Sequence, residues 1–289
     1  MIQVIGYLRF SYPGRSDARL THDADPDRLR QRLYNTHRME QRFHLFEHIC
    51  LPSMDAQTDQ NFKLLILIAN DMPAHHRDRL DDLLVGRPYV ELITDATMQT
   101  QEAFNHRAGH VKRPNATKIV HFRLDDDDAL SSHYIQNIRT MAKRAERQTI
   151  LSMSRGIMLA MIDGEVHLVE ETTPYIPIGW ALVLDPKTER NPFQAAPFHA
   201  ATRMQSMVDP RNLSYIHTVH AGSDSKQGAD RTIRAHLKRF GRTKDHPDYV
   251  RMIEAMEKEF PCFTEEYLRN VRATIPRGPN YDLRLCRVQ

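Results

Sequence analysis

Four consecutive carboxylates, Asp125-Asp126-Asp127-Asp128, are the clearest chemical signal in the sequence. Adjacent carboxylates repel one another unless cations, water or backbone donors offset their charge. A solvated loop would be the plain explanation, but the run stands between a strand-like segment, 119–124, and the apolar pair Ala129-Leu130. Asp125 and Asp127 leave the strand on one side and can share a Mg²⁺ or Mn²⁺ ion, whose shell substrate phosphates commonly complete. The run therefore predicts a site for a divalent cation and a diphosphate.

Two of the 16 histidines are placed where they could reach such an ion. The segment 215–220, Tyr-Ile-His-Thr-Val-His, is typical of a strand and leads into a turn at Ala221-Gly222. Imidazole is a suitable Mn²⁺ ligand, so we expect His220, or in its place His217, to complete the metal shell. The alternative for either residue is a structural histidine whose ring is held by a hydrogen bond to the backbone.

Charge and composition narrow the classes of partner. Lys and Arg number 40 against 37 Asp and Glu, a net charge of +3, and the arginines are spread along the chain, so nucleic acid is not the expected partner. Cys50, Cys262 and Cys286 lack CxxC spacing, which argues against a disulfide framework or thiolate zinc site and favours a cytoplasmic location. No window approaches about 18 apolar residues, so we expect no signal peptide or transmembrane segment. Peripheral membrane association stays open.

The elements before the acidic run alternate between buried strands and amphipathic helices. Asp25-Pro26 is typical of a helix start, Pro52 of its end, and Gly86 of a C-terminal cap. Strands are expected at 2–10, 62–69, 89–94 and 118–124, and helices at 25–52, 74–85 and 99–110. This order predicts an α/β fold with a mostly parallel central sheet flanked by helices. Ligands of such folds bind beyond the carboxyl ends of the strands, where the acidic run lies.

The pattern changes after the run. Ser131 or Ser132 could cap the next helix, and Asp163-Gly164 is the strongest hairpin signal in the chain. The expected elements are a helix up to Arg147, strands at 149–154, 180–184 and 215–220, a hairpin of 156–162 and 165–170, and helices at 232–239, 249–260 and 265–273. The second half is therefore expected to hold an antiparallel hairpin region, much loop, and a helical C-terminal portion.

Several stretches carry a resemblance to a known family. They are Leu8-Arg9-Phe10-Ser11, Arg42-Phe43-x-x-Phe46-Glu47, Leu51-Pro52-Ser53-Met54, Gln57-Thr58-Asp59-Gln60-Asn61-Phe62 and Arg123-Leu124-Asp125-Asp126-Asp127-Asp128-Ala129-Leu130. Over most of its length the chain resembles the putative rhamnosyltransferase family, a bacterial group of GT-A-type glycosyltransferases. The resemblance implies one GT-A-like domain over 1–289, with a nucleotide-sugar-binding half at 1–130 and an acceptor half with C-terminal helices at 131–289. It implies transfer of a sugar, by the family's name rhamnose, from a nucleotide-diphosphate donor to a glycan or other hydroxyl acceptor.

The resemblance also assigns the acidic run. It implies that Asp125, Asp127 and Asp128 bind the metal and the diphosphate, that Asp126 joins Asp125 in contacting the donor, and that His220 closes the metal site. The metal would be Mn²⁺ or Mg²⁺. Around His220 the sequence His-Ala-Gly-Ser-Asp departs from the family's pattern at Ala221 and Ser223.

Further donor contacts are implied at two places. In such enzymes the loop after the first strand lies near the nucleotide, so Arg9, Phe10 and Ser11 are candidates for contact with base or phosphate, although Phe10 could instead be core. Asn105 and Arg107 precede the strand of the acidic run and fall in the zone of the donor sugar. A last candidate, Arg123, either contacts the donor or pairs with the acidic run and holds it in place.

The acceptor side is less determined. Inverting transfer needs a carboxylate that takes the proton of the acceptor hydroxyl. Glu170, Glu171, Asp185 and Asp224 all lie in the expected acceptor half; spacing selects none of them, and we carry Glu170 and Asp224 forward as candidates. Trp180 could stack on an acceptor sugar or belong to the core.

Two other functions use similar residues. A metal-dependent phosphohydrolase or nuclease also clusters carboxylates around ions, but it predicts a second metal constellation, and the sequence has no HExxH motif and no Walker loop. A non-catalytic module could bind Ca²⁺ or a nucleotide, but the run lacks the spaced D-x-D-x-D-G loop of calcium sites. Glycosyl transfer therefore explains the pattern best.

Overall fold

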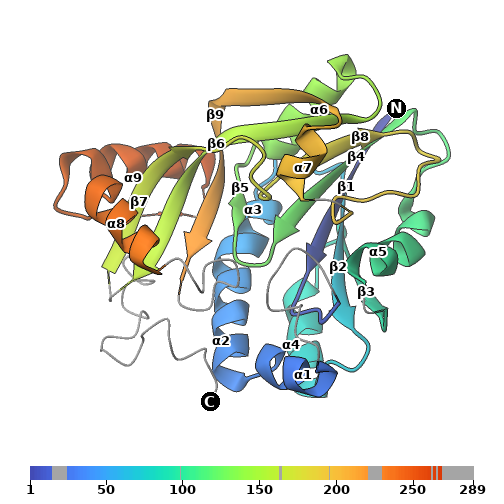
Figure 1. Ribbon diagram of the computed structural model, residues 1–289, viewed down its shortest axis with the longest axis horizontal. Helices are drawn as coiled ribbons and strands as arrows, with labels where there is room; N and C mark the ends of the chain where they lie inside the picture. Colours follow the sequence, from blue (N-terminus) through green and yellow to red (C-terminus); the bar gives the residue numbers. More distant parts are fainter. Residues whose placement is uncertain are drawn as a thin grey trace.

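A computed structural model describes residues 1–14, 25–97, 99–162, 165–194, 196–220, 230–261, 263–264 and 266–268. Its strands form one mixed sheet in the order β3-β2-β1-β4-β8-β6-β9-β5, with β7 paired to β6 outside this path (Figure 1). The strands are β1 (Ile2–Arg9), β2 (Lys63–Ala69), β3 (Val90–Asp95), β4 (Lys118–Asp125), β5 (Ala129–Leu130), β6 (Thr149–Ile162), β7 (Glu165–Thr172), β8 (Ala181–Leu184) and β9 (Gln205–Val219). The helices are α1 (Pro26–Leu33), α2 (Thr36–Leu45), α3 (Leu51–Asp55), α4 (Ala74–Leu84), α5 (Thr100–Ala108), α6 (Tyr134–Arg144), α7 (Pro197–Ala201), α8 (Asp230–Phe240) and α9 (Pro247–Glu259). The predicted α/β class, with helices flanking a central sheet, is confirmed.

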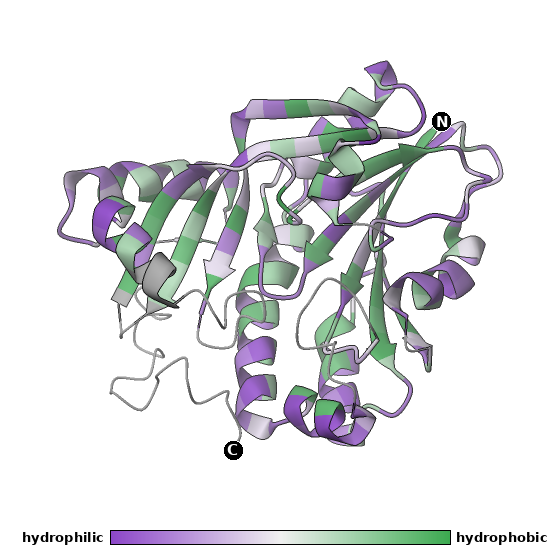
Figure 2. Ribbon diagram, viewed as in Figure 1, coloured by the Kyte–Doolittle hydropathy of each residue, from purple (hydrophilic) through white to green (hydrophobic). Residues whose placement is uncertain are grey.

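Strands β3, β2, β1 and β4 form a parallel layer that is buried on both faces. In β1, Val4 and Leu8 pack with α2, α4 and α6, while Ile5 and Tyr7 point to the other face, towards α5. Figure 2 shows β1, β2 and β4 as largely apolar strands, as expected for a sheet with helices on both sides. Arg9 pairs with Asp125 at the carboxyl edge of this layer, so the ends of β1 and β4 lie side by side.

The second half of the sheet has longer strands than the sequence predicts. The segments 149–154 and 156–162 are one strand, β6, whose register against β9 is irregular between Met153 and Gly156. The strand predicted at 215–220 is too short, because β9 begins at Gln205 and ends at Val219. Its first residues are mostly exposed, so no apolar alternation marks them. The predicted hairpin is confirmed as the antiparallel pair β6 and β7.

Gly156 lies at the irregular point of β6 for a steric reason. A Cβ atom at this position would lie 2.1 Å from Cε2 of Tyr215 on the neighbouring strand β9. The ring of Tyr215 is buried and crosses the strand where the glycine leaves space. Gly156 therefore fixes how closely β6 and β9 approach beside the hairpin of β6 and β7.

The single long helix predicted over 25–52 is wrong. Asp25 does cap α1 as predicted, but this helix ends at Leu33. The side chain of Asn35 then caps a separate helix, α2, by accepting a hydrogen bond from the N–H of Arg38. A π-helical turn, η2 (Phe46–Cys50), then joins α2 to α3. Pro52 stands in the first turn of α3, where no intrahelical N–H is needed, so it does not end the helix.

The cap predicted for the next helix is also wrong. α6 begins after His133, which is its N-cap residue and makes no side-chain cap. The backbone N–H of Ser132 donates to the carbonyl of Glu259, and that of Ser131 donates to the carbonyl of Ser214. Both serines are committed to contacts with the C-terminal half. The chain directly after the acidic run is thereby tied to β9 and α9.

Helices α8 and α9 cover the outer part of the sheet beside β6, β7 and β9 (Figure 1). They confirm the predicted helical C-terminal portion as far as Glu259; the helix predicted at 265–273 falls mostly outside the described residues. None of the described helices combines the length and the apolar character that crossing a membrane requires.

Candidate active site

The acidic run lies at the carboxyl end of β4, in the turn that leads to β5. Asp125 closes β4, and the N–H of Asp128 donates to its carbonyl at 3.3 Å. β5 pairs antiparallel with β9, which sets Ala129 opposite Ile216. Because the pairing is antiparallel, the residues that follow Ile216 lie beside the acidic run, which precedes Ala129.

Three of the four carboxylates are buried. Asp126, Asp127 and Asp128 are 4%, 8% and 5% exposed, whereas the side chain of Asp125 is 26% exposed. Burying carboxylates is unfavourable unless charges or hydrogen bonds compensate them. The observed burial argues against the solvated-loop reading of this sequence.

Each carboxylate of the run has a partner from the protein. Arg123 lies 3.2 Å from Asp125, and Arg42 lies 2.5 Å from Asp126 and 3.0 Å from Asp127. The remaining contacts come from β9 and its end: the Thr218 N–H donates to Asp128 Oδ1 at 2.9 Å, and Nε2 of His220 lies 3.0 Å from Asp127 Oδ2. Asp127 thus receives the most cationic surroundings of the four.

The buried carboxylates of the run differ in pKa because their surroundings differ. Burial raises the pKa of Asp126 to about 7 against the opposing charge of Arg42. Burial also raises the pKa of Asp127, but Arg42 and His220 outweigh it and hold that pKa below its usual range. Burial and the charges of Asp127 and Asp125 raise the pKa of Asp128 well above its ordinary value. Of the three buried carboxylates, Asp127 is accordingly the one whose surroundings favour the ionised form.

The two candidate histidines have different partners. His220 is buried against Asp127, while His217 Nδ1 lies 3.2 Å from Oε1 of Glu171 on β7. They differ because residues three apart on a strand point to opposite faces. The geometry brings His220 to the acidic run and His217 to a carboxylate of the hairpin.

The side chains that could bind a metal suit a Mn²⁺ or Mg²⁺ ion that takes only some of its ligands from the protein. Asp127 and His220 offer a carboxylate and an imidazole that already touch, and Asp125 lies two residues away with an accessible carboxylate. Among the described residues, no group of three or more His, Cys, Asp or Glu side chains is arranged to hold a metal ion. Such an ion keeps several ligand positions for water and substrate phosphate, so the residues present fit it.

The residues at the end of β1 differ in burial: some belong to the core, and others lie at the carboxyl edge of the sheet. Phe10 is fully buried between Phe43 and Phe46, with ring centroids 4.9 and 5.1 Å away, which is the core alternative that the sequence left open for it. Ser11 is 6% exposed and its hydroxyl accepts from Arg38 at 3.0 Å. Arg9 is half-buried at the carboxyl edge of the sheet.

An aromatic ring not singled out from the sequence lies beside this edge. The guanidinium groups of Arg123 and Arg9 lie 4.6 and 5.8 Å from the centroid of the Phe193 ring. Phe193 also stacks on Phe104 of α5 at 5.2 Å. Sequence reasoning missed it because it stands in a proline-punctuated loop far from β1 and β4 in the chain.

The two candidates on α5 have different surroundings. Asn105 accepts a hydrogen bond of 2.7 Å from the buried Asn191, so its side chain fastens the loop before α7. Arg107 lies 3.5 Å from Asp95, the last residue of β3. Burial raises the pKa of Asp95, but hydrogen bonds from Thr97 and His106 outweigh it and lower that pKa. Asp95 was missed, although the rule that pointed to Asp125, a carboxylate at the end of a parallel strand, applies to it equally.

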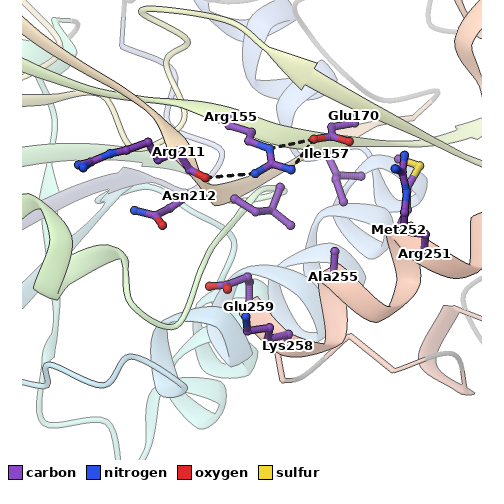
Figure 3. Close-up of a pocket in the computed structure, with 11 residues that line it drawn as sticks. Arg155, Ile157, Glu170, Arg211, Asn212, Arg251, Met252, Ala255, Lys258 and Glu259 are labelled. Carbon is purple, nitrogen blue, oxygen red and sulfur yellow. Dashed lines mark hydrogen bonds and ion pairs between the residues drawn. The ribbon is translucent and has the colours of Figure 1, made fainter. Parts of the chain in front are cut away.

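Glu170 lies outside the acidic cluster. Residues 170, 157, 216 and 129 stand opposite one another on successive strands, so Glu170 lies three inter-strand spacings, about 14 Å, from Ala129. Figure 3 shows it paired with Arg155 in a pocket of about 360 Å³ between β6, β7, β9 and α9. Its carboxylate is engaged and distant from the run, which makes it a poor candidate for the proton acceptor.

The other acceptor-side candidates are also placed. Leu184 pairs with Ile119, near the amino end of β4, so Asp185 lies at the opposite edge of the sheet from the acidic run. Trp180 is 1% exposed and packs with Ile150 and Leu182, which is the core role and leaves no ring face for a sugar. Asp224 lies outside the described residues.

Comparison with known proteins places the chain in a family. Three solved structures that match this chain share little sequence with it. The structure of S. aureus TarS 1–349 in complex with UDP-GlcNAc is 10% identical, with 91% of this chain and 74% of the TarS chain covered and a TM-score of 0.42. The putative nucleotide-diphospho-sugar transferase from Desulfovibrio desulfuricans G20 is 12% identical, with 89% of this chain and 96% of that chain covered and a TM-score of 0.35. The structure of GalNAc-T7 with UDP, GalNAc and Mn²⁺ is 9% identical, with 96% of this chain and 58% of that chain covered and a TM-score of 0.42. No curated protein matches the sequence. The model of the glycosyltransferase family described as "Putative rhamnosyl transferase" matches residues 3–232, and the chain belongs to this family.

Proposed function

We propose that the protein is a metal-dependent glycosyltransferase that moves a hexose, by its family's name rhamnose, from a nucleotide-diphosphate sugar to a hydroxyl group of a glycan or other acceptor. The observation that carries this proposal is the contact between Asp127 and His220 inside a buried acidic cluster at the carboxyl end of β4. Both residues fall within the stretch that matches the family.

Asp127 and His220 would hold the cation, with Asp125 and Asp128 as further predicted ligands. When bound, a divalent cation stabilises the negative charge that develops on the leaving diphosphate. Arg123 contributes by holding Asp125 at 3.2 Å, which restrains the more exposed end of the run. The burial of the run supports this role, because charges act more strongly where water is excluded.

The proposed donor half spans residues 1–130. Its parallel strands end at one edge with Arg9, Asp95 and Asp125, so a nucleotide at that edge would meet both cations and hydrogen-bond acceptors. Arg107 lies beside Asp95 and adds a half-exposed guanidinium that could bind phosphate. Residues 131–289 would then supply the acceptor side within the same domain.

For the proton acceptor we favour Glu171 among the described candidates. Its carboxylate lies 3.2 Å from His217, and both side chains are more than four-fifths buried. His217 stands on β9 one residue before Thr218, whose N–H donates to Asp128, so His217 connects Glu171 on β7 to the strand that borders the acidic run. A carboxylate oriented by a histidine is suited to take a proton from a hydroxyl group. Asp224 remains the alternative.

Calorimetry of purified protein against UDP, dTDP and GDP, each with and without Mn²⁺, tests the proposal. We expect one nucleotide diphosphate to bind only with Mn²⁺, and Asp127→Asn and His220→Gln to weaken that binding at least tenfold, about 1.4 kcal/mol. Asp209→Asn is the matched control, because Asp209 is also buried and ion-paired but lies on the far part of β9. Folded wild-type protein that binds none of the three nucleotides would overturn the proposal.

A further inference from the structure

One arginine enters the acidic cluster from a helix far away in the chain. Arg42 is 84 residues from Asp126 in sequence, is 7% exposed, and comes from the last turn of α2. Its Nη1 lies 2.5 Å from Asp126 Oδ1 and 3.0 Å from Asp127 Oδ2. A single guanidinium nitrogen therefore bridges two neighbouring carboxylates, one of which also contacts His220.

The helix geometry fixes Arg42 in this place. The N–H of Phe46 donates to the carbonyls of both Arg42 and Phe43, and the π-helical turn η2 begins there. Phe43 and Phe46 anchor the two sides of this junction in the core against Phe10. π-Helical turns are rare and often occur at functional sites. Arg42 therefore extends from a helix junction whose neighbouring rings are buried, and it is itself 7% exposed.

The charges around the run show what Arg42 does. An arginine stays protonated at all physiological pH values, so it is a permanent cation. Arg123 faces Asp125, and Arg42 faces Asp126 and shares Asp127. The four carboxylates therefore present much less negative charge than the sequence suggests. A cation next to a metal site repels a metal ion, and the repulsion is large where both are shielded from water.

Taking the metal-dependent transfer proposed above as given, we propose that Arg42 is an internal counter-ion that keeps Mn²⁺ from binding stably to the acidic run alone, so that the ion binds together with the nucleotide diphosphate. The diphosphate brings the negative charge that Arg42 removes. Asp126 serves in this arrangement as the partner of Arg42 and not as a metal ligand.

A charge cycle tests the proposal through Mn²⁺ binding, measured by calorimetry and by electron paramagnetic resonance, with and without UDP, dTDP or GDP. Arg42→Gln removes a positive charge, and we expect Mn²⁺ alone to bind at least tenfold more tightly than to wild type, about 1.4 kcal/mol. The titrations are made at pH 8, above the pKa of about 7 of Asp126, so Asp126→Asn removes a negative charge and we expect Mn²⁺ alone to bind at least tenfold more weakly. The double variant restores the charge balance, and we expect an affinity near wild type and normal folding.

Two controls separate a charge effect from a structural one. Arg139→Gln removes another arginine that is mostly buried and ion-paired, to Asp59, on α6, and it should leave Mn²⁺ affinity unchanged. Arg42→Lys keeps a positive charge and should not gain affinity for Mn²⁺ alone. A purely structural ion pair would lower the melting temperature in both single variants without shifting Mn²⁺ affinity in opposite directions.

The outcomes are distinct. Opposite shifts in the two single variants, cancelled in the double variant, support the proposal. Unchanged or weakened Mn²⁺ binding in Arg42→Gln, while wild type still binds Mn²⁺ with a nucleotide diphosphate, overturns it and leaves the proposed function standing. If Arg42→Gln does not fold, an affinity of Asp126→Asn equal to or above wild type overturns it by itself. Folded wild type that binds no nucleotide diphosphate with Mn²⁺ overturns the proposed function as well.

Discussion

His121, in the middle of β4, should make the stability of the fold depend on pH. Its ring is fully buried, Nδ1 lies 2.7 Å from the hydroxyl of Tyr7 on β1, and the ring stacks on Tyr7 at 5.6 Å. Burial, with a smaller contribution from the charge of Lys112, lowers the pKa of His121 from 6.5 to about 3. The neutral imidazole is thus part of the native core.

The sign and size of the effect follow from linkage. Between pH 6.5 and 3 the unfolded chain binds a proton at His121 and the native chain does not, so lowering the pH in this window destabilises the native state. Each pH unit is worth about 1.4 kcal/mol, so acidification from pH 6.5 to 5.0 should remove about 2 kcal/mol of unfolding free energy through this residue alone. Above about pH 7.5 the unfolded histidine is neutral as well, so the residue contributes no pH dependence there.

Urea unfolding of wild type and His121→Gln at pH 5.0, 6.5 and 7.5 measures this contribution. The variant has a lower absolute stability, but its loss of unfolding free energy between pH 6.5 and 5.0 should be smaller than that of wild type by about 2 kcal/mol. His199→Gln, at an exposed position on α7, should show the wild-type pH dependence. Parallel pH profiles for wild type and His121→Gln would refute the reasoning, because they would mean that His121 is not held neutral by burial.

Three further predictions concern packing and chemistry. Gly156→Ala should destabilise the fold by about 1–3 kcal/mol in urea unfolding, because its Cβ would lie 2.1 Å from the Tyr215 ring; unchanged stability would show that β6 and β9 separate easily. Trp180→Ala should lower unfolding free energy by about 3–5 kcal/mol as a core truncation, and a selective loss of acceptor affinity in a normally stable protein would restore the acceptor reading. Glu171→Gln should reduce the turnover number at least tenfold while donor binding measured by calorimetry stays within twofold, and full turnover would leave Asp224 as the candidate base.

The parallel half of the fold could be predicted from the sequence because each strand is a continuous apolar run with a clear end. The boundaries of β2 and β4 differ from the predicted ones by one residue at most. β9 could be predicted only from Tyr215 onward, since its first part is exposed and has no apolar period. β5 has two residues, too few for any periodic signal. The helix over 25–52 was drawn too long because the cap at Asn35 falls within an otherwise amphipathic pattern.

Site residues could be predicted where they are neighbours in the sequence, and they were missed where only the fold brings them together. The acidic run is visible because four carboxylates are neighbours in the chain, and His220 because its strand ends in a turn. Arg42 lay within a recognised motif, yet no local pattern shows which face of α2 meets the run 84 residues later. The same limit applies to Phe193, whose contacts with Arg9 and Arg123 depend on a loop packing against two strands.

The pairing of β9 with β5 also determines when the site can form during folding. Arg42 and His220 reach the acidic run across 84 and 93 residues of chain, and closing such long loops is slow compared with forming local helices. The cluster therefore exists only after the last strand has docked in register, and a fragment that stops before β9 would leave three buried carboxylates without His220 and Thr218. Capture of a nucleotide diphosphate with Mn²⁺ would accordingly report the final docking step of the whole chain, and could serve as a kinetic probe of native assembly.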